Sequence, residues 1–383
     1  MPTQTLRKIL TRDFILVFLS QLAFSITYHA LYPTLPVYLS RFGSTEIEIG
    51  ILIGAMAVSS VVFRPFIGRA LLKTAEKRFL IAGAALLVLS YVAYLFAPPF
   101  WPLFIVRVFH GISLALFFTA SFTFVSNISA DAHRGQTFSY YLLATNISLA
   151  IAPSFGMFII NRFPFAFLLL ICLGLSLSCL FTASKLGNRQ IPPLEESFTN
   201  EGFLFSRKAL PASILCFFFH FTWGALAAFF PLYAIHHGMA NPGLFFTVVA
   251  LILISGRVSG GRILDLYNRE KVILPCLMLC IISMGILAFS KSFPMFVLVA
   301  VVWGIGHAFF FPSLVAYAVD KMGSSRGPGM GTFTGLSDLG ISLGPAIMGI
   351  VIHLTGYFTM FLCLALVGML SLTYFYFFVR EKE

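Results

Sequence analysis

The hydrophobic positions of this chain fall into about a dozen long apolar runs, separated by short polar segments. A helix needs roughly 20 apolar residues to cross the ~30 Å hydrocarbon core of a bilayer, where the backbone must satisfy its own hydrogen bonds. The pattern therefore predicts an all-α membrane protein with twelve transmembrane helices. The runs cover residues 14–39, 47–70, 79–97, 100–126, 136–161, 163–184, 209–235, 243–266, 272–290, 293–319, 329–353 and 356–379.

Composition agrees with this pattern. Hydrophobic residues make up 59% of the 383 positions and charged residues only 10%, against about 25% charged residues in an ordinary soluble domain. The first run has full length and no small-residue cleavage site, so we expect it to remain as a helix rather than a signal peptide. All six cysteines lie within the runs without a C-x-x-C motif, so we expect neither a metal site nor disulfides.

The net charge of +11 is explained by where the basic residues lie, and nucleic acid is not an expected partner. With the N-terminus inside, the cytoplasmic segments hold most lysines and arginines, and only Arg41, Arg162 and Lys291 lie outside. This is the positive-inside distribution, and it predicts that both termini are cytoplasmic. Arg64, Arg107 and Arg257 remain within apolar runs.

An internal repeat with an offset of 192 to 195 residues relates the two halves of the sequence. "FRPFIGR" aligns with "GRVSGGR", which places Arg64 on Arg257, and "NISLAIAPSFG" aligns with "DLGISLGPAIMG", which places Pro153 on Pro345. The repeat predicts two six-helix halves in the same orientation. We place them at residues 1–184 and 207–383, joined by a polar cytoplasmic linker at 185–206.

Three short motifs within these halves resemble the major facilitator superfamily. "GRILDLYNREK" resembles that family's loop between the second and third helices of a half, although the first-half copy has Leu72 in place of the aspartate. "RVFHG" resembles the arginine motif of the fourth helix, and "GISLGPAIMG" the glycine-proline motif of helices five and eleven. The resemblance implies two parallel halves around a central cavity, working by alternating access.

The motif set most resembles the drug and metabolite antiporter branch of that family. This implies export of a small molecule coupled to proton entry across a bacterial cytoplasmic membrane, by a monomer among membrane lipids and without a cofactor. The chain has no G-x-x-x-x-G-K-[ST] loop, and we expect no enzyme activity. A proton-coupled or facilitated importer and a lipid or lipid-linked sugar flippase share the architecture. A receptor or structural protein would not need a polar cavity face.

Polar side chains within the apolar runs form the candidate site, because a charge at the bilayer centre costs roughly 2.5–3.5 kcal/mol on insertion scales. The first run carries a polar stripe on one helical face, which fits either a cavity lining or hydrogen bonds between helices. Histidines lie at similar depths in the first, fourth, seventh and tenth runs, which line the cavity in the resembled family. The expected substrate-binding residues are Gln21, Tyr28, His29, Tyr32, Arg107, His110, His220, Trp223, Trp303 and His307.

The substrate class follows from charge. The cavity helices of the first half carry Arg107 and His110 but no carboxylate within their spans. This favours an anionic, zwitterionic or amphipathic metabolite or drug, such as a carboxylate-bearing molecule, over a simple lipophilic cation, since an arginine can form a forked contact with a carboxylate. Arg107 bracing helices within its own half is the alternative.

Asp338 is the one carboxylate well within an apolar run. Desolvation favours its neutral form and a nearby arginine favours its charged form, so a moving partner can switch its protonation. We expect Asp338 to couple transport to protons, with Arg64 across the two halves or Arg257 in its own half as partner; a static ion pair is the alternative.

The loop "GRILDLYNREK" is expected to act as a gating latch through Gly261, Arg262, Asp265 and Arg269.

Overall fold

The computed structural model describes residues 10–71, 73–129, 134–187, 207–266, 269–322 and 326–380. Within these ranges, the side chains of residues 134–135, 257–266, 269, 322 and 326–329 are outside the description. The described residues contain twelve α-helices, as the hydrophobic pattern predicts. All statements below concern these described parts of the chain.

Most consecutive helices are separated by only a few residues, whereas residues 185–209 separate the sixth helix from the seventh. Several contain an internal proline, which membrane helices tolerate because neighbouring groups satisfy the freed backbone positions. The helices are α2 (Arg12–Arg41), α3 (Glu46–Leu71), α4 (Glu76–Phe96), α5 (Trp101–Ile128), α6 (Arg134–Ile160), α7 (Phe165–Ser184), α8 (Leu210–His236), α9 (Gly243–Leu266), α10 (Arg269–Phe289), α11 (Phe293–Met322), α12 (Arg326–Thr355) and α13 (Tyr357–Tyr374), which continues as a π-helical turn at Phe375–Val379.

Eleven of these helices are long and apolar enough to cross a membrane. The twelfth, α9, contributes the shorter apolar stretch Gly243–Gly256 within its described side chains. The structure therefore agrees with a multi-pass membrane protein whose spans coincide with the apolar runs of the sequence.

Contacts divide the chain into two compact units that differ from the two sequence halves. One unit holds Met1–Leu31 and Val58–Glu196, and the other holds Tyr32–Ala57 and Ser197–Glu383. Helices α2 and α3 each contribute one part to each unit. The last third of α2 and the first half of α3 therefore pack with the C-terminal helices.

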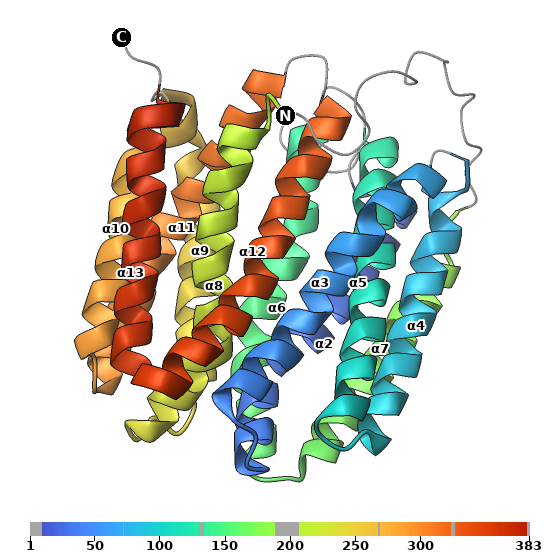
Figure 1. Ribbon diagram of the computed structural model, residues 1–383. Coiled ribbons are helices and arrows are strands. Elements are labelled where there is room, and N and C mark those ends of the chain that lie inside the picture. Colours follow the sequence, from blue (N-terminus) through green and yellow to red (C-terminus); the bar gives the residue numbers. More distant parts are fainter. Residues whose placement is uncertain are drawn as a thin grey trace. The chain divides into compact units, whose positions relative to one another are not determined.

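Equivalent helix pairs pack together in both units, as an internal repeat requires. In the first unit α4 contacts α5 and α7, and in the second unit α10 contacts α11 and α13. These are the third, fourth and sixth helices of each six-helix set. Figure 1 shows α13, in red, running beside α10, in orange.

Glycines of α12 allow close backbone approach inside the second unit. A Cβ at Gly340 would lie 2.9 Å from the backbone nitrogen of Phe221 on α8, and one at Gly349 would lie 2.5 Å from the carbonyl oxygen of Glu46 on α3. Small residues at such contacts let membrane helices pack without intervening side chains. Glycines spaced along α12 therefore hold both α8 and the first half of α3 against it.

Candidate functional site

A buried basic cluster lies between α4 and α5 in the first unit. Arg107 is 4% exposed and His110 is fully buried. The Tyr94 hydroxyl oxygen lies 3.1 Å from Nδ1 of His110, and Arg107 interacts with the same hydroxyl. Tyr91 packs edge-on against His110 at 5.6 Å between ring centroids. The two residues of the "RVFHG" motif therefore share one set of tyrosine partners on α4.

The one acidic residue of α4 and α5 lies away from this cluster. Between them, α4 and α5 carry a single acidic residue, Glu76 in the first turn of α4. Its carboxylate accepts a hydrogen bond from Asn127, near the opposite end of α5 from Arg107. The Nε2 atom of His110 is buried without a hydrogen-bond partner among the described residues. The site therefore contains the guanidinium of Arg107 and a buried imidazole nitrogen, Nε2 of His110, that makes no hydrogen bond among the described residues.

The polar stripe of α2 makes hydrogen bonds to α6. The Tyr141 hydroxyl donates to Oε1 of Gln21 at 2.6 Å, and Nε2 of Gln21 donates to the hydroxyl of Thr145 at 3.2 Å. The Tyr141 hydroxyl also lies 2.7 Å from Oγ of Ser121 on α5. Gln21 thus joins α2 to α6 from a fully buried position, and through Tyr141 to α5.

His29 makes a second contact along the same face. Its Nδ1 atom lies 2.6 Å from Oγ of Ser148 on α6, and both side chains are buried. Tyr28 and Tyr32 are only half-buried. The stripe thus contains two residues that bond to α6 and two tyrosines with part of their surface open.

An aromatic stack occupies the second unit. The Trp303 ring is stacked with Phe219 at 5.4 Å and with Trp223 at 6.2 Å, and the interplanar angles are 11° and 12°. His307 stands edge-on to Trp223 at 5.6 Å. Tyr32 also approaches Trp223, with 6.5 Å between ring centroids. Four of the predicted substrate-binding residues, Tyr32, Trp223, Trp303 and His307, therefore meet in one cluster.

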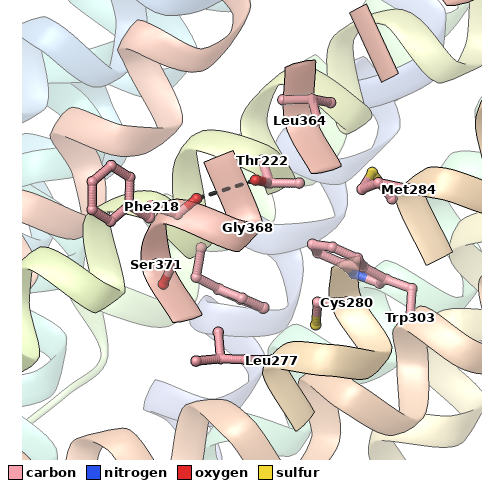
Figure 2. A pocket seen from close by; sticks show the side chains of 10 residues that line it. Phe218, Thr222, Leu277, Cys280, Met284, Trp303, Leu364, Gly368 and Ser371 are labelled. Atoms are coloured by element: carbon pink, nitrogen blue, oxygen red, sulfur yellow. Dashed lines mark hydrogen bonds between the residues drawn. The ribbon is translucent and has the colours of Figure 1, made fainter. Parts of the chain in front are cut away.

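A small apolar pocket lies behind this stack, between α8, α10, α11 and α13 (Figure 2). Trp303 forms one wall, and Cys280, Leu277 and Met284 of α10 form another. Two buried polar atoms of the lining, Nε1 of Trp303 and Oγ of Ser371, have no hydrogen-bond partner among the described residues. The pocket is thus lined by two members of the aromatic stack, Phe219 and Trp303, and by residues of α10 and α13.

His220 lies on a different contact, the one between α8 and α12. Its Nδ1 atom is 2.9 Å from the carbonyl oxygen of Cys216 and 3.3 Å from that residue's Sγ. Asp338 of α12 is half-buried. His29 and His110 have different partners, whereas His220 and His307 both pack against the ring of Phe219. The described residues hold no group of three or more potential metal ligands.

The remaining predicted residues are placed only in part. Arg64 lies in the first unit, where its Nε atom donates to Oγ of Ser60 at 3.3 Å. Arg257 and the four residues of the gating motif, Gly261, Arg262, Asp265 and Arg269, have side chains outside the described residues. The pairing of Asp338 with either arginine and the gating latch stay predictions.

Sequence reasoning missed several members of these clusters. Tyr91 and Tyr94 are spaced to share one face of α4, as are Tyr141, Thr145 and Ser148 along α6. That spacing could have identified these residues from the sequence. It is weak evidence by itself, because tyrosine and serine are also frequent at helix contacts and membrane interfaces.

Twelve described helices, eleven of them long and apolar enough to cross a membrane, with polar clusters inside them, define a multi-pass membrane protein. The chain matches the family model described as "Major Facilitator Superfamily" over residues 14–265 and 240–383. It belongs to that family.

Several bacterial relatives are named as export or resistance proteins. The staphylopine export protein of Staphylococcus aureus (strain Mu50 / ATCC 700699) is 25% identical over 337 residues, which cover 84% of each chain. Multidrug resistance protein 2 of Bacillus subtilis (strain 168) is 24% identical and covers 84% of each chain. The quinolone resistance protein NorA of S. aureus is 21% identical, covering 88% of this chain and 89% of NorA. The chain is thus similar to drug and metabolite exporters, and it is a secondary active transporter.

Solved structures show the same fold. The nucleoside transporter NupG superposes with a TM-score of 0.75 at 15% identity, covering 97% of this chain and 100% of NupG. The human organic anion transporter MFSD10 (TETRAN) superposes with a TM-score of 0.72 at 15% identity, covering 95% and 98% of the two chains. At this level of identity the likeness concerns the fold alone.

Proposed function

We propose that this protein exports an anionic or zwitterionic small molecule in exchange for protons, across the cytoplasmic membrane of a bacterium and with both termini in the cytoplasm. It acts as a monomer, without a cofactor and without enzymatic chemistry. The direction is supported by relatives named as export and resistance proteins. Proton coupling is supported by the intramembrane carboxylate Asp338.

The buried basic cluster carries the proposal for substrate class. Arg107 is nearly inaccessible, and its neighbours Tyr91, Tyr94 and His110 bear no negative charge at neutral pH. A charge held in a low-dielectric region acts more strongly on a ligand than it would in water. A carboxylate that approaches this cluster can accept hydrogen bonds from the guanidinium and tyrosine groups.

The aromatic stack supports a substrate that is also partly apolar. Trp223 and Trp303 present large ring surfaces beside His307, and Tyr32 adds a phenol. Tryptophan and tyrosine bind amphipathic ligands through apolar contact while keeping one polar atom for orientation. The aromatic stack of the second unit therefore favours a substrate with a planar or apolar portion.

Transport in proteoliposomes tests this function. Vesicles loaded at one pH and diluted into another would be assayed with staphylopine and with a carboxylated quinolone, and ethidium would serve as the cationic comparison. We expect the carboxylated probes to move against their gradient when protons flow in the opposite direction. Uptake of these probes that ignores the pH gradient would contradict proton coupling.

A further inference from the structure

The first turn of α3 contacts the last turn of α12 through a charged pair. Nδ1 of His353 on α12 lies 3.4 Å from Oε2 of Glu46 on α3. The two side chains keep 46% and 35% of their surface exposed, so the pair can exchange protons with solvent. Both residues belong to the second unit, although the internal repeat assigns α3 and α12 to different six-helix halves.

The backbones of the same two helices approach closely next to this pair. A Cβ at Gly349 of α12 would lie 2.5 Å from the carbonyl oxygen of Glu46, and a Cβ at Gly54 of α3 would lie 2.5 Å from that of Ser342. Small residues let the two helices pack without intervening side chains. The charged pair therefore lies at one end of a contact that extends over about two turns of α3.

The chemistry of the pair makes its strength depend on pH. An ionised carboxylate can only accept a hydrogen bond, so Nδ1 of His353 carries a hydrogen in either charge state and Nε2 takes up the titrating proton. This proton turns a neutral donor into a cation beside Glu46, and charge-assisted hydrogen bonds are roughly twice as strong as neutral ones. Histidine changes charge between about pH 5 and about pH 8.

Two further titratable side chains lie near the carboxylate of Glu46. Tyr357, the first residue of α13, interacts with Glu46, and its ring packs against Tyr233 at 5.6 Å between centroids. Glu48 accepts a hydrogen bond from the backbone nitrogen of Thr45 at 2.8 Å. A phenol does not titrate in the range where a histidine changes charge, so Tyr357 does not supply the same pH response.

Two other histidines lie at the end of α8 in the same unit. His236 and His237 pack against each other at 5.3 Å between ring centroids, and His237 packs against Tyr233 at 4.5 Å. Lys291, between α10 and α11, lies close to His237. Neither histidine forms the contact between α3 and α12, which depends on His353.

We propose that Glu46 and His353 form a pH-sensitive ion pair that holds α3 against α12 on the outer side of the membrane. The inference rests on the proposed export and its orientation, because with both termini in the cytoplasm the start of α3 and the end of α12 face outward. Acidic surroundings protonate His353 and strengthen the contact, and alkaline surroundings weaken it. Alternating access requires the two six-helix halves to part on the outer side, so the pair makes this opening depend on outer pH.

Spin labels beside the pair test it without a substrate. Phe42 and Leu354 are 63% and 73% exposed, so labels can be attached at Phe42→Cys and Leu354→Cys. A Cys363→Ser background removes the half-buried native cysteine, and the other five are buried. Double electron–electron resonance in lipid would give the ratio of close to separated labels. We expect this ratio to rise about 1.5- to 5-fold from about pH 8 to about pH 5, as for an exposed ion pair.

Substitutions of the pair separate its charge from its shape. His353→Gln keeps a donor but does not titrate, and Glu46→Gln removes the negative charge, so both should abolish the pH response. His353→Lys stays charged over the whole range and should keep the high ratio at both pH values. His236→Gln is the matched control, because His236 is an exposed histidine at the end of α8, and it should respond to pH as the wild type does.

Two results would overturn the pH-sensitive pair. One is a ratio of close to separated labels that does not change with pH in the wild type, and the other is a pH response that persists in His353→Gln. Failure of the wild type to transport the carboxylated probes would instead remove the proposed function. Because the labels report the contact without a substrate, the two failures are distinguishable.

Discussion

The hydroxyl oxygen of Tyr94 on α4 lies 3.1 Å from Nδ1 of His110 on α5, and Arg107 interacts with that same hydroxyl. This contact shows where the two basic side chains of the fourth span, Arg107 and His110, lie. Arg107 and His110 are one helical turn apart, and both face a helix that offers them phenol groups rather than carboxylates. In the proposed function, a carboxylate of the substrate approaches Arg107 at this position.

Removing the hydroxyl of Tyr94 should therefore lower substrate affinity while the protein still folds. We expect Tyr94→Phe to weaken binding of a carboxylated quinolone by roughly 5- to 30-fold, which corresponds to the loss of about one charge-assisted hydrogen bond. Uptake into proteoliposomes at several quinolone concentrations would measure it. Tyr140→Phe on α6 is the control, because Tyr140 makes its hydrogen bond to the exposed Gln136. Equal apparent affinity in wild type and Tyr94→Phe would remove Tyr94 from the site.

The hydrogen bonds of Gln21 should contribute to stability. Tyr141→Phe removes the donor to Oε1 of Gln21, a fully buried side chain, and leaves a buried acceptor without that partner. The expected loss is about 1–3 kcal/mol. Thermal unfolding in detergent would show it as a lower midpoint, again with Tyr140→Phe as the neighbouring control. An unchanged midpoint would mean that water replaces the phenol at no cost.

The contact between α8 and α12 depends on glycine at position 224. A Cβ there would lie 2.5 Å from the carbonyl oxygen of Ile341 and 2.9 Å from its Cα, so Gly224→Ala must push the helices apart. We expect a loss of about 1–3 kcal/mol, the usual cost of overpacking. Gly285→Ala on α10 is the matched control, since nothing lies within 4 Å of its Cβ position. Equal thermal stability of the two variants would contradict the close approach.

Much of the fold could be predicted from the sequence, because the membrane imposes length and polarity on each span. The twelve helices coincide with the apolar runs, and the equivalent pairs α4–α5 and α10–α11 agree with the internal repeat. The glycines of the "GISLGPAIMG" motif lie at close helix contacts, at Gly340, Gly344 and Gly349.

The partners of the polar residues could not be predicted in the same way. In a membrane protein both the lipid-facing and the buried faces are apolar, so the hydrophobic pattern does not show which face of α4 meets α5. The sequence therefore picked out Arg107 and His110 but missed Tyr91 and Tyr94. The division of the chain into two compact units could not be predicted for a related reason. The apolar runs of α2 and α3 are continuous, so the sequence does not show that Tyr32–Ala57 packs with the second unit while the flanking parts of the same helices pack with the first.

Proton-driven export of a carboxylate-bearing molecule, through a site that contains Arg107, can be tested by one measurement. A carboxylated quinolone and ethidium would be assayed for accumulation in the same inverted proteoliposomes under an imposed pH gradient, with wild type, Arg107→Ala and Arg107→Lys. We expect wild type to accumulate the quinolone but little ethidium, Arg107→Ala to lose most quinolone transport, and Arg107→Lys to keep part of it because a point charge lacks the forked contact. Strong accumulation of ethidium, equal in wild type and Arg107→Ala, would contradict this function.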